Sequence, residues 1–267
     1  MYKVWIFLKR RVVTFASYRM ALVMSFLGVL LSSLQFYFMS RMLGDGLYIP
    51  SLSPYGGDLM SYLIIGSSFL GLVNVGLTSS SGAIRNEQLT GTLEFLLMSE
   101  TPLWQILAYS AVADFLSAAV GTVVVFAAMA LCIGMEVHAN LVAAGVVLLL
   151  AVISMSGIGL MSAGMIMVTK QGDPVSWVFG VLSGFMSGAV FPVELLPSAL
   201  RYLSRLLPSS HALSALRKAI TANASLSEVS GDVASLALLA LVYVPLGILA
   251  LSQGFNIARS RGGLAEY

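Results

Sequence analysis

Six long apolar runs constrain this sequence more than any other feature. A helix of about 20 mainly apolar residues crosses a lipid bilayer, and it pairs all of its backbone N–H and C=O groups internally. The 267 residues are 58% hydrophobic and 10% charged, whereas a soluble domain carries roughly 25% charged residues. These proportions exclude a water-soluble globular protein. The predicted spans are 19–39, 59–79, 106–133, 141–168, 175–191 and 233–255.

The positions of lysine and arginine predict the orientation of the chain, because basic residues concentrate on the cytoplasmic side of a membrane. With the N-terminus inside, nine of the 14 basic residues are cytoplasmic, and most of the others fall between the fifth and sixth spans. Six spans then place both termini inside. Residues 1–18 are predicted to form an interfacial helix, in which Trp5 and Phe7 enter the headgroup region beside Lys9 and Arg10.

A half-polar segment separates the second and third spans. On a helix over residues 86–98, one face carries Leu89, Leu93, Leu96 and Leu97, and the opposite face carries Glu87, Gly91, Glu94 and Met98. Such a helix lies along the membrane surface or docks into a groove of another protein. Its periodicity fits an ordinary connector equally well. Thr101 can cap the next helix, and Pro102 fits its first turn.

Two of the spans contain polar or acidic residues that are unusual in hydrocarbon. The second span has a small polar face formed by Ser67, Gly71, Asn74 and Thr78. Polar side chains in a membrane line a water-filled path or bond between helices, and the pattern leaves both open. Asp114 is an intramembrane acid of the third span. It is either functional or a structural partner of Arg85 or Lys170.

The fifth span carries a ridge of glycines at four-residue spacing, Gly180, Gly184 and Gly188. Such a ridge allows another helix backbone to approach closely. The pattern predicts a packing seam but does not say whether its partner belongs to the same subunit or to a second one.

Two stretches of this sequence resemble the type-2 ABC exporter permeases. The first is similar to the cytoplasmic loop of that family and comprises Arg85-Asn86-Glu87-Gln88, Gly91-Thr92-Leu93-Glu94-Phe95-Leu96-Leu97 and Thr101-Pro102-Leu103. The second resembles the outer segment of the family and comprises Phe191-Pro192, Leu195-Leu196-Pro197, Leu206-Leu207-Pro208 and Ala215-Leu216-Arg217. Both occur in the order that the family has, on a chain with six predicted spans.

The resemblance implies an all-α membrane protein that forms a single permease domain. Its six transmembrane helices would be joined by a cytoplasmic coupling helix at 85–101 and by outer re-entrant helices at 192–232. Glu87, Gly91, Glu94 and Met98 would contact the ATPase. Ser67, Gly71, Asn74 and Thr78 would line the translocation path, beside the glycine seam. The outer gate would include Phe191, Pro192, Arg201, Arg205 and Arg217, whose basic side chains meet solvent, lipid head groups or an anionic substrate.

The resemblance also implies partners and a location. A P-loop requires G-x-x-x-x-G-K-[ST], and no Gly-Lys pair occurs here, so ATP and magnesium would bind to two copies of a separate ABC ATPase subunit. A second permease subunit, identical or related, would complete the complex. No cofactor, metal site, catalytic residue or nucleic acid is expected in the chain itself, since Cys132, His138 and His211 are isolated. The expected location is a prokaryotic cytoplasmic membrane.

The implied function is ATP-driven export. Compact outer loops and a 10% aromatic content favour a lipid-like or hydrophobic cargo over a glycan. One alternative is a secondary transporter or channel, which would show inverted repeats or interrupted helices. Another is an intramembrane serine protease, which needs G-x-S-G and a histidine in a later span. The corresponding run here is Ser154-Met155-Ser156-Gly157, without the first glycine.

Overall fold

The computed structural model describes residues 59–92, 101–133, 139–169 and 172–260, with single positions between 27 and 42. Every regular element in the four long ranges is helical, which confirms the predicted all-α class. The elements are α3 (Leu59–Leu89), α5 (Leu103–Ile133), α6 (Leu141–Thr169), α7 (Pro174–Met186), η2 (Val193–Leu195), α8 (Ser198–Ser204), α9 (Pro208–Thr221) and α10 (Ser230–Ser260). The predicted interfacial helix lies outside the described residues, as does the first span apart from isolated helical positions.

Four helices, α3, α5, α6 and α10, are long and apolar enough to cross a membrane. A helix of 31 residues has a length of about 46 Å at 1.5 Å per residue. That length exceeds the roughly 30 Å of a hydrocarbon core. The helices are therefore longer than the apolar runs predicted, and α3 continues from the predicted end at Ser79 to Leu89.

The predicted C-terminal end of the fifth span is wrong. α7 has 13 residues and ends at Met186, before the predicted end at Phe191. A helix of that length covers only about 20 Å. The helix ends locally because Gly188 has a φ of 84°, a left-handed conformation that glycine adopts without a steric penalty. The described ranges thus hold four membrane-length helices and one shorter apolar helix where five spans were predicted.

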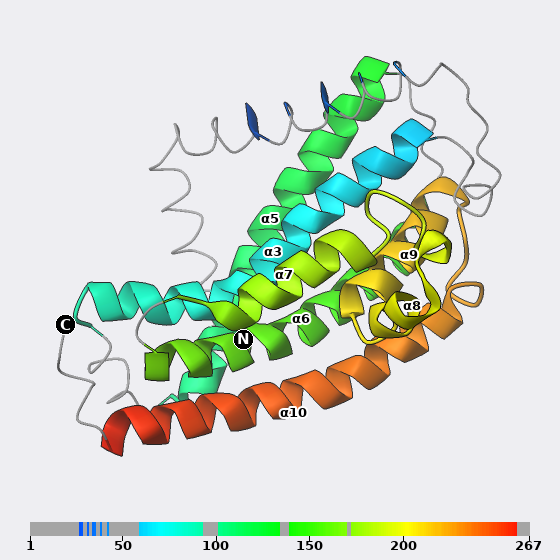
Figure 1. The fold of residues 1–267 in the computed structure, drawn as a ribbon. Coiled ribbons are helices and arrows are strands. Elements are labelled where there is room, and N and C mark those ends of the chain that lie inside the picture. The colour runs from blue at the N-terminus through cyan, green and yellow to red at the C-terminus, as the bar shows by residue number, and fades with distance from the viewer. Residues whose placement is uncertain are drawn as a thin grey trace.

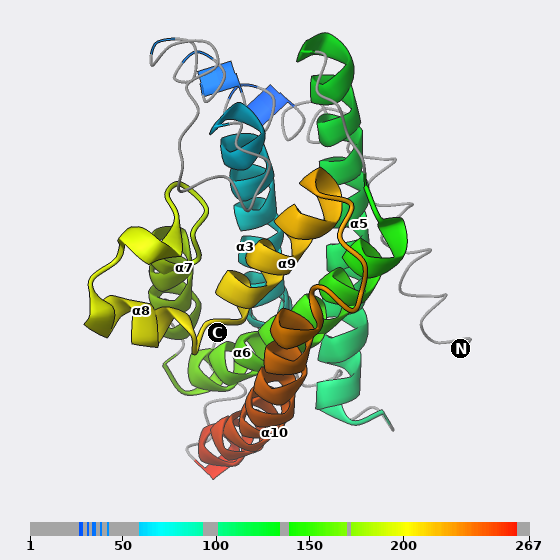
Figure 2. The same ribbon diagram turned by 90° about the vertical axis from the view of Figure 1, so that its right-hand side faces the viewer.

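The core of the protein surrounds α6. Val147 and Met155 of α6 pack in one buried cluster with Leu72 and Leu77 of α3 and Leu236 of α10. A second cluster joins the far ends of α3, α5, α6 and α10. Figure 1 shows α9 beside the first turns of α10, and Figure 2 shows α9 next to α3 and α8 next to α7. We call this the α9 end of the bundle; α3 reaches the opposite end at Leu89.

The helices α6 and α10 cross with their backbones in contact. Gly157 and Gly164 lie seven residues apart on α6, and Gly247 and Gly254 have the same spacing on α10. A Cβ atom on Gly247 would lie 2.2 Å from the carbonyl oxygen of Gly157, and one on Gly254 would lie 2.2 Å from that of Gly164. A methyl group therefore has no room at either crossing point. Close packing of small residues is a main source of helix association in membranes.

The predicted glycine ridge on α7 has no such contact. A Cβ atom on Gly180 or Gly184 would meet no atom of the described residues within 4 Å. Gly188 lies beyond Met186, the last residue of α7. The predicted ridge is therefore wrong at Gly188, because the helix ends before this residue. The role of Gly180 and Gly184 in a contact with another subunit stays a prediction.

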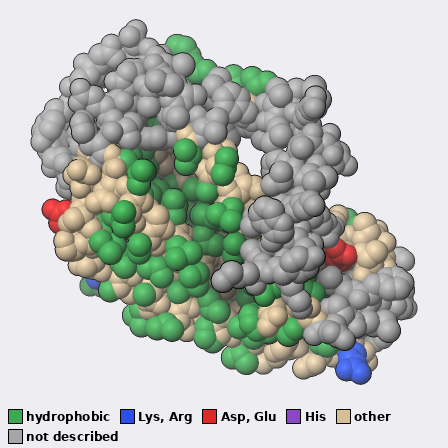
Figure 3. Space-filling view, turned by 180° about the vertical axis from the view of Figure 1, so that it is seen from behind, with side chains coloured by type: hydrophobic (Ala, Val, Ile, Leu, Met, Phe, Trp, Pro, Cys, Tyr) green, Lys and Arg blue, Asp and Glu red, His purple; other side chains and the backbone are tan. Residues whose placement is uncertain are grey.

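The outer surfaces of the long helices are apolar. Leu238, Leu241 and Leu249 of α10 and Val120 and Val123 of α5 are all more than half exposed. Figure 3 shows hydrophobic side chains spread over one face, with the visible charged side chains near its edges. Exposed apolar area of this extent marks a surface that another apolar medium covers. These faces fit a multi-pass membrane protein surrounded by lipid.

Candidate functional site

The small and polar residues predicted to share a face of α3 do share one. Gly71 and Asn74 are exposed, and Ser67 and Thr78 are partly exposed. The Ser67 and Thr78 hydroxyl groups donate to carbonyl oxygens of their own helix, those of Ile64 at 3.1 Å and Asn74 at 2.8 Å. We call the four residues the α3 polar strip. Because polar groups are costly in hydrocarbon, a strip exposed on a membrane helix is expected to face water or another polypeptide.

At the opposite end of the bundle, α3 finishes in a glycine turn. Gly91 has a φ of 69°. Its N–H donates to the carbonyl oxygen of Gln88 at 3.2 Å, and the N–H of Thr92 donates to that of Glu87 at 3.0 Å. This pair of bonds is the Schellman motif, which terminates helices at a left-handed glycine. The Thr92 hydroxyl also donates to the Glu87 carboxylate, so Glu87 and Gly91 together form the end of α3.

The prediction that a separate helix begins at Asn86 is therefore wrong, because α3 continues through Leu89. Gln88 is 4% exposed, so the last turn of α3 is still packed on the protein. Glu94 and Met98 lie outside the described residues. A coupling helix that begins only after Gly91 stays a prediction.

Arg217 is the residue whose surroundings differ most from the prediction. It was expected at an exposed gate, but it is only 2% exposed. From α9 its guanidinium donates to the carbonyl oxygens of Gly188 at 2.7 Å, Tyr62 at 2.9 Å and Ala189 at 3.0 Å. Its Cζ atom lies 3.3 Å from the ring centroid of Tyr62. The prediction that Arg217 faces solvent or lipid is therefore wrong, because the protein encloses the side chain and forms hydrogen bonds with it.

Beside Arg217, Gly66 of α3 leaves no room for a side chain. A Cβ atom on Gly66 would lie 2.6 Å from Nη2 of Arg217 and 2.1 Å from the carbonyl oxygen of Ala189. The Tyr62 hydroxyl donates to the Gly188 carbonyl oxygen at 2.5 Å, beside the arginine. We call these five residues the arginine junction. It joins α3, the turn after α7, and α9.

The five predicted gate residues do not form one group. Phe191 is partly buried and Pro192 is buried, whereas Arg201 in α8 and Arg205 at its C-terminal cap are exposed. Arg201 donates to two backbone carbonyl oxygens of the preceding segment, at 2.5 and 3.1 Å. Arg217 bonds to Tyr62 of α3. The described structure thus separates an inner arginine from two surface arginines.

The comparison with protein families decides between the interpretations of the sequence. Residues 46–249 match the family described as ABC-2 family transporter protein, a range that includes α3 and the arginine junction. The chain belongs to the ABC-2 transporter family. A comparison with curated proteins finds no match. The resemblance to ABC permeases is confirmed.

Membership of the ABC-2 family defines the general role of this protein. It is a multi-pass membrane protein and the permease component of an ABC transporter. Such a component has no ATPase of its own and works with an ABC ATPase subunit. The family consists of transporters, which disfavours the serine-protease alternative.

Asp114 of this ABC-2 protein is held by α3. The Ser79 hydroxyl donates to its Oδ2 atom at 2.6 Å. Of the two partners predicted from the sequence, Arg85 is exposed and Lys170 lies outside the described residues. Ser79 was not predicted, although a serine run on a membrane helix is a signal for bonds between helices.

A second carboxylate, that of Asp173, lies at the start of α7. Asp173 caps α7, accepting the backbone N–H of Ser176 at 3.0 Å and the Ser162 hydroxyl. Burial by itself raises the pKa of Asp173, but hydrogen bonds from Ser162, Ser81 and Ser176 outweigh it and hold the pKa below 3.8. Ser79 thus ties α3 to α5. The Ser176 hydroxyl of α7 donates to the carbonyl oxygen of Leu77 at 2.9 Å and ties α3 to the start of α7.

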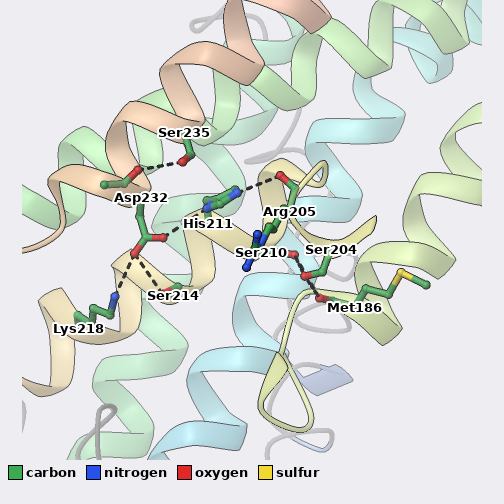
Figure 4. A network of polar contacts seen from close by, with 10 residues as sticks. Met186, Ser204, Arg205, Ser210, His211, Ser214, Lys218, Asp232 and Ser235 are labelled. Atoms are coloured by element: carbon green, nitrogen blue, oxygen red, sulfur yellow. Dashed lines mark hydrogen bonds and ion pairs between the residues drawn. The ribbon is translucent and has the colours of Figure 1, made fainter. Parts of the chain in front are cut away.

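At the α9 end, Asp232 of α10 holds three side chains of α9. Its carboxylate lies 3.4 Å from Nδ1 of His211, 3.2 Å from the Ser214 hydroxyl and 3.1 Å from Nζ of Lys218. Nε2 of His211 lies 3.0 Å from the carbonyl oxygen of Arg205. Figure 4 shows this network between the two helices. Both ring nitrogens face acceptors, so the protonated imidazole satisfies both contacts.

We expect His211 to stabilise the ABC-2 protein mainly at acidic pH. The bond to Asp232 raises the pKa of His211 above 6.5, against the effect of burial, and the Arg205 carbonyl raises it further. A raised pKa gives stability that is complete below the unfolded value and lost as pH rises through the folded value. His211→Gln should therefore lower the thermal unfolding midpoint more at about pH 5.5 than at about pH 8.5. An equal loss at both values would contradict this.

Sequence reasoning missed the arginine junction for a specific reason. Arg217 follows Leu213 by four residues, and both are buried on α9. An arginine on the apolar stripe of a helix was the available signal. Its partners could not be found in the same way, because Tyr62 and Gly188 belong to segments far away in the sequence.

Proposed function

We propose that this chain is the permease subunit of an ATP-driven exporter, in which two permease subunits bind two ATPase subunits. The observation that supports this best is the α3 polar strip, which is exposed on a helix of membrane length. In a paired complex, two such strips would face each other across a water-accessible path. Ser67, Gly71, Asn74 and Thr78 would then line the path that the cargo follows.

ATP and Mg²⁺ bind to the ATPase subunits in this proposal, and their closure moves the coupling segment (residues 85–101). Two features of α3 support the mechanism. The helix ends at the coupling segment, and it begins at the arginine junction. The distribution of basic residues supports a cytoplasmic coupling segment and an outer α9 end. Both termini are then cytoplasmic.

A lipid-like or hydrophobic cargo fits the strip better than a glycan does. The four residues are small and carry hydroxyl, amide or hydrogen side chains. Sugar rings are commonly bound by stacking on aromatic rings, and the strip has none. A polar head group can exchange hydrogen bonds with Asn74, while its apolar chains stay in lipid.

Cysteine accessibility tests the proposed path. In a Cys132→Ala background, Asn74→Cys should react with a membrane-impermeant thiol reagent, because water reaches the strip. Leu241→Cys on α10 is the matched control, since its side chain is 74% exposed but apolar neighbours surround it. It should react only with a lipid-soluble reagent. The measurement is mass spectrometry of the labelled protein in nanodiscs.

Nucleotide dependence completes this test. In complexes with the ATPase encoded nearest to this chain, ATP and vanadate should change the labelling rate of Asn74→Cys and leave Leu241→Cys unchanged. If the two cysteines label alike, or if no ATPase subunit copurifies, the proposed function is wrong.

A further inference from the structure

The arginine junction lies where α3 meets the outer helices, and its geometry suggests a mechanical role. We propose that Arg217 is a positioning residue that transmits movement of α3 to the hairpin formed by α8 and α9. This inference rests on the proposed function, because it assumes that the ATPase displaces α3 at its opposite end. It adds to that proposal the residue through which the displacement reaches the α9 end.

The helix α3 is built to carry a displacement from one end to the other. It is continuous from Leu59 to Leu89 and contains no proline. Tyr62 lies in its first turn, and Glu87 lies in its last turn, within the coupling segment. A continuous helix moves largely as a rigid element. Displacement at Glu87 therefore reaches Tyr62.

The contacts of Arg217 make the attachment at Tyr62 directional. Apolar packing is non-directional, so α9 could slide on α3 if only apolar side chains joined them. The planar guanidinium instead donates in a fixed fork to the carbonyl oxygens of Tyr62 on α3 and of Gly188 and Ala189 after α7. The Tyr62 hydroxyl binds the same Gly188 oxygen. Movement of α3 without α9 would break these bonds, and the Arg217 guanidinium is buried at 2% exposure.

From α9 the displacement continues to the neighbouring elements through polar bonds. The Ser209 hydroxyl of α9 donates to the Ser183 hydroxyl of α7 at 2.9 Å. The Ser204 hydroxyl of α8 donates to the carbonyl oxygen of Met186 at 2.7 Å. The hairpin is thus tied at two points to the end of α7 that leads into the turn bonded by Arg217. Figure 2 shows α7, α8 and α9 around this end of the bundle.

Two pairs of spin labels test the inference in complexes with the ATPase that carry one labelled permease copy. The first pair, Asn86→Cys and Asn256→Cys, reports on the end of α3 relative to α10. The second pair, Leu203→Cys and Leu238→Cys, reports on α8 relative to α10. All four positions are exposed, and Cys132→Ala removes the native thiol. Distances are measured without nucleotide and with ATP plus vanadate.

In the wild type, both distances should change with nucleotide. In Arg217→Lys, the distance of the first pair should still change with nucleotide, whereas the distance of the second pair should stay the same. Lysine keeps the charge but lacks the planar fork, so it cannot hold three carbonyl oxygens in the same geometry. Arg201→Lys is the matched control, because the Arg201 side chain is exposed and, among the contacts described, bonds only to the segment just before α8. It should leave both changes intact.

The two proposals fail in different ways. If the first pair does not change in the wild type, the ATPase does not move α3, and the proposed function fails together with this inference. This inference alone is wrong if the distances of both pairs still change with nucleotide in Arg217→Lys. It is also wrong alone if only the distance of the first pair changes in the wild type. Should Arg217→Lys not fold, Tyr62→Phe removes one bond of the junction. It should reduce the change of the second pair, and an unreduced change would overturn the proposal.

Discussion

Replacing Gly247 by valine should disrupt the crossing of α6 and α10 and leave little folded protein. A Cβ atom at this position would lie 2.2 Å from the carbonyl oxygen of Gly157 and 3.0 Å from Cβ of Leu160. The first of these atoms belongs to the α6 backbone and cannot rotate away. Overpacking of a core usually costs 1–3 kcal/mol, and we expect about 3 kcal/mol or more where a backbone must move. The thermal unfolding midpoint and the monodisperse yield measure the loss.

Gly145→Val is the matched control for this prediction. Gly145 lies on α6, is exposed and has open space around its Cβ position. Valine there should change the unfolding midpoint little. The unfolding midpoint of Gly247→Ala should lie between those of Gly145→Val and Gly247→Val, because a single methyl group already enters the contact. If Gly145→Val and Gly247→Val were equally destabilising, helix propensity and not the close approach of the backbones would be responsible.

The sequence predicted the existence of the long helices better than their ends. Crossing a bilayer needs a long apolar run, and α3, α5, α6 and α10 each contain one. The end of α3 was predicted too early, because Asn86, Glu87 and Gln88 look like the start of a polar connector. Burial of Gln88 against other elements keeps the helix continuous. That is a tertiary effect, which local polarity does not reveal. Gly91 was the reliable stop signal.

The glycine contacts illustrate a second limit of prediction from the sequence. Four-residue spacing on α7 predicted a seam, yet the described contacts lie between glycines spaced by seven residues on α6 and α10. Either pattern permits close approach. What decides is whether a partner helix presents its own glycine at the crossing point. Gly157 and Gly247 are distant in the sequence, so neither spacing alone identifies the pair.

The two ends of α3 now have different physical characters. At the α9 end, Arg217 bonds α3 to two other segments in a buried site. At the opposite end, a left-handed glycine sets the direction in which the chain leaves the helix. The first end depends on buried polar contacts and the second on a backbone conformation. Substitutions at the second end should therefore affect the ATPase interaction while leaving the fold intact.

Gly91→Val should weaken the association with the ATPase subunit without unfolding the permease. Valine at a φ of 69° costs about 1–2 kcal/mol, so the turn changes and the coupling segment leaves α3 in another direction. A loss of 1.4 kcal/mol corresponds to about a tenfold weaker Kd, measured by titrating the ATPase subunit onto nanodiscs. Gly91→Asn should lose less affinity for the ATPase subunit, because asparagine tolerates this conformation better than valine does. Gly82→Val, on open helical surface, should bind normally. Equal weakening by all three would mean that the turn conformation does not position the coupling segment.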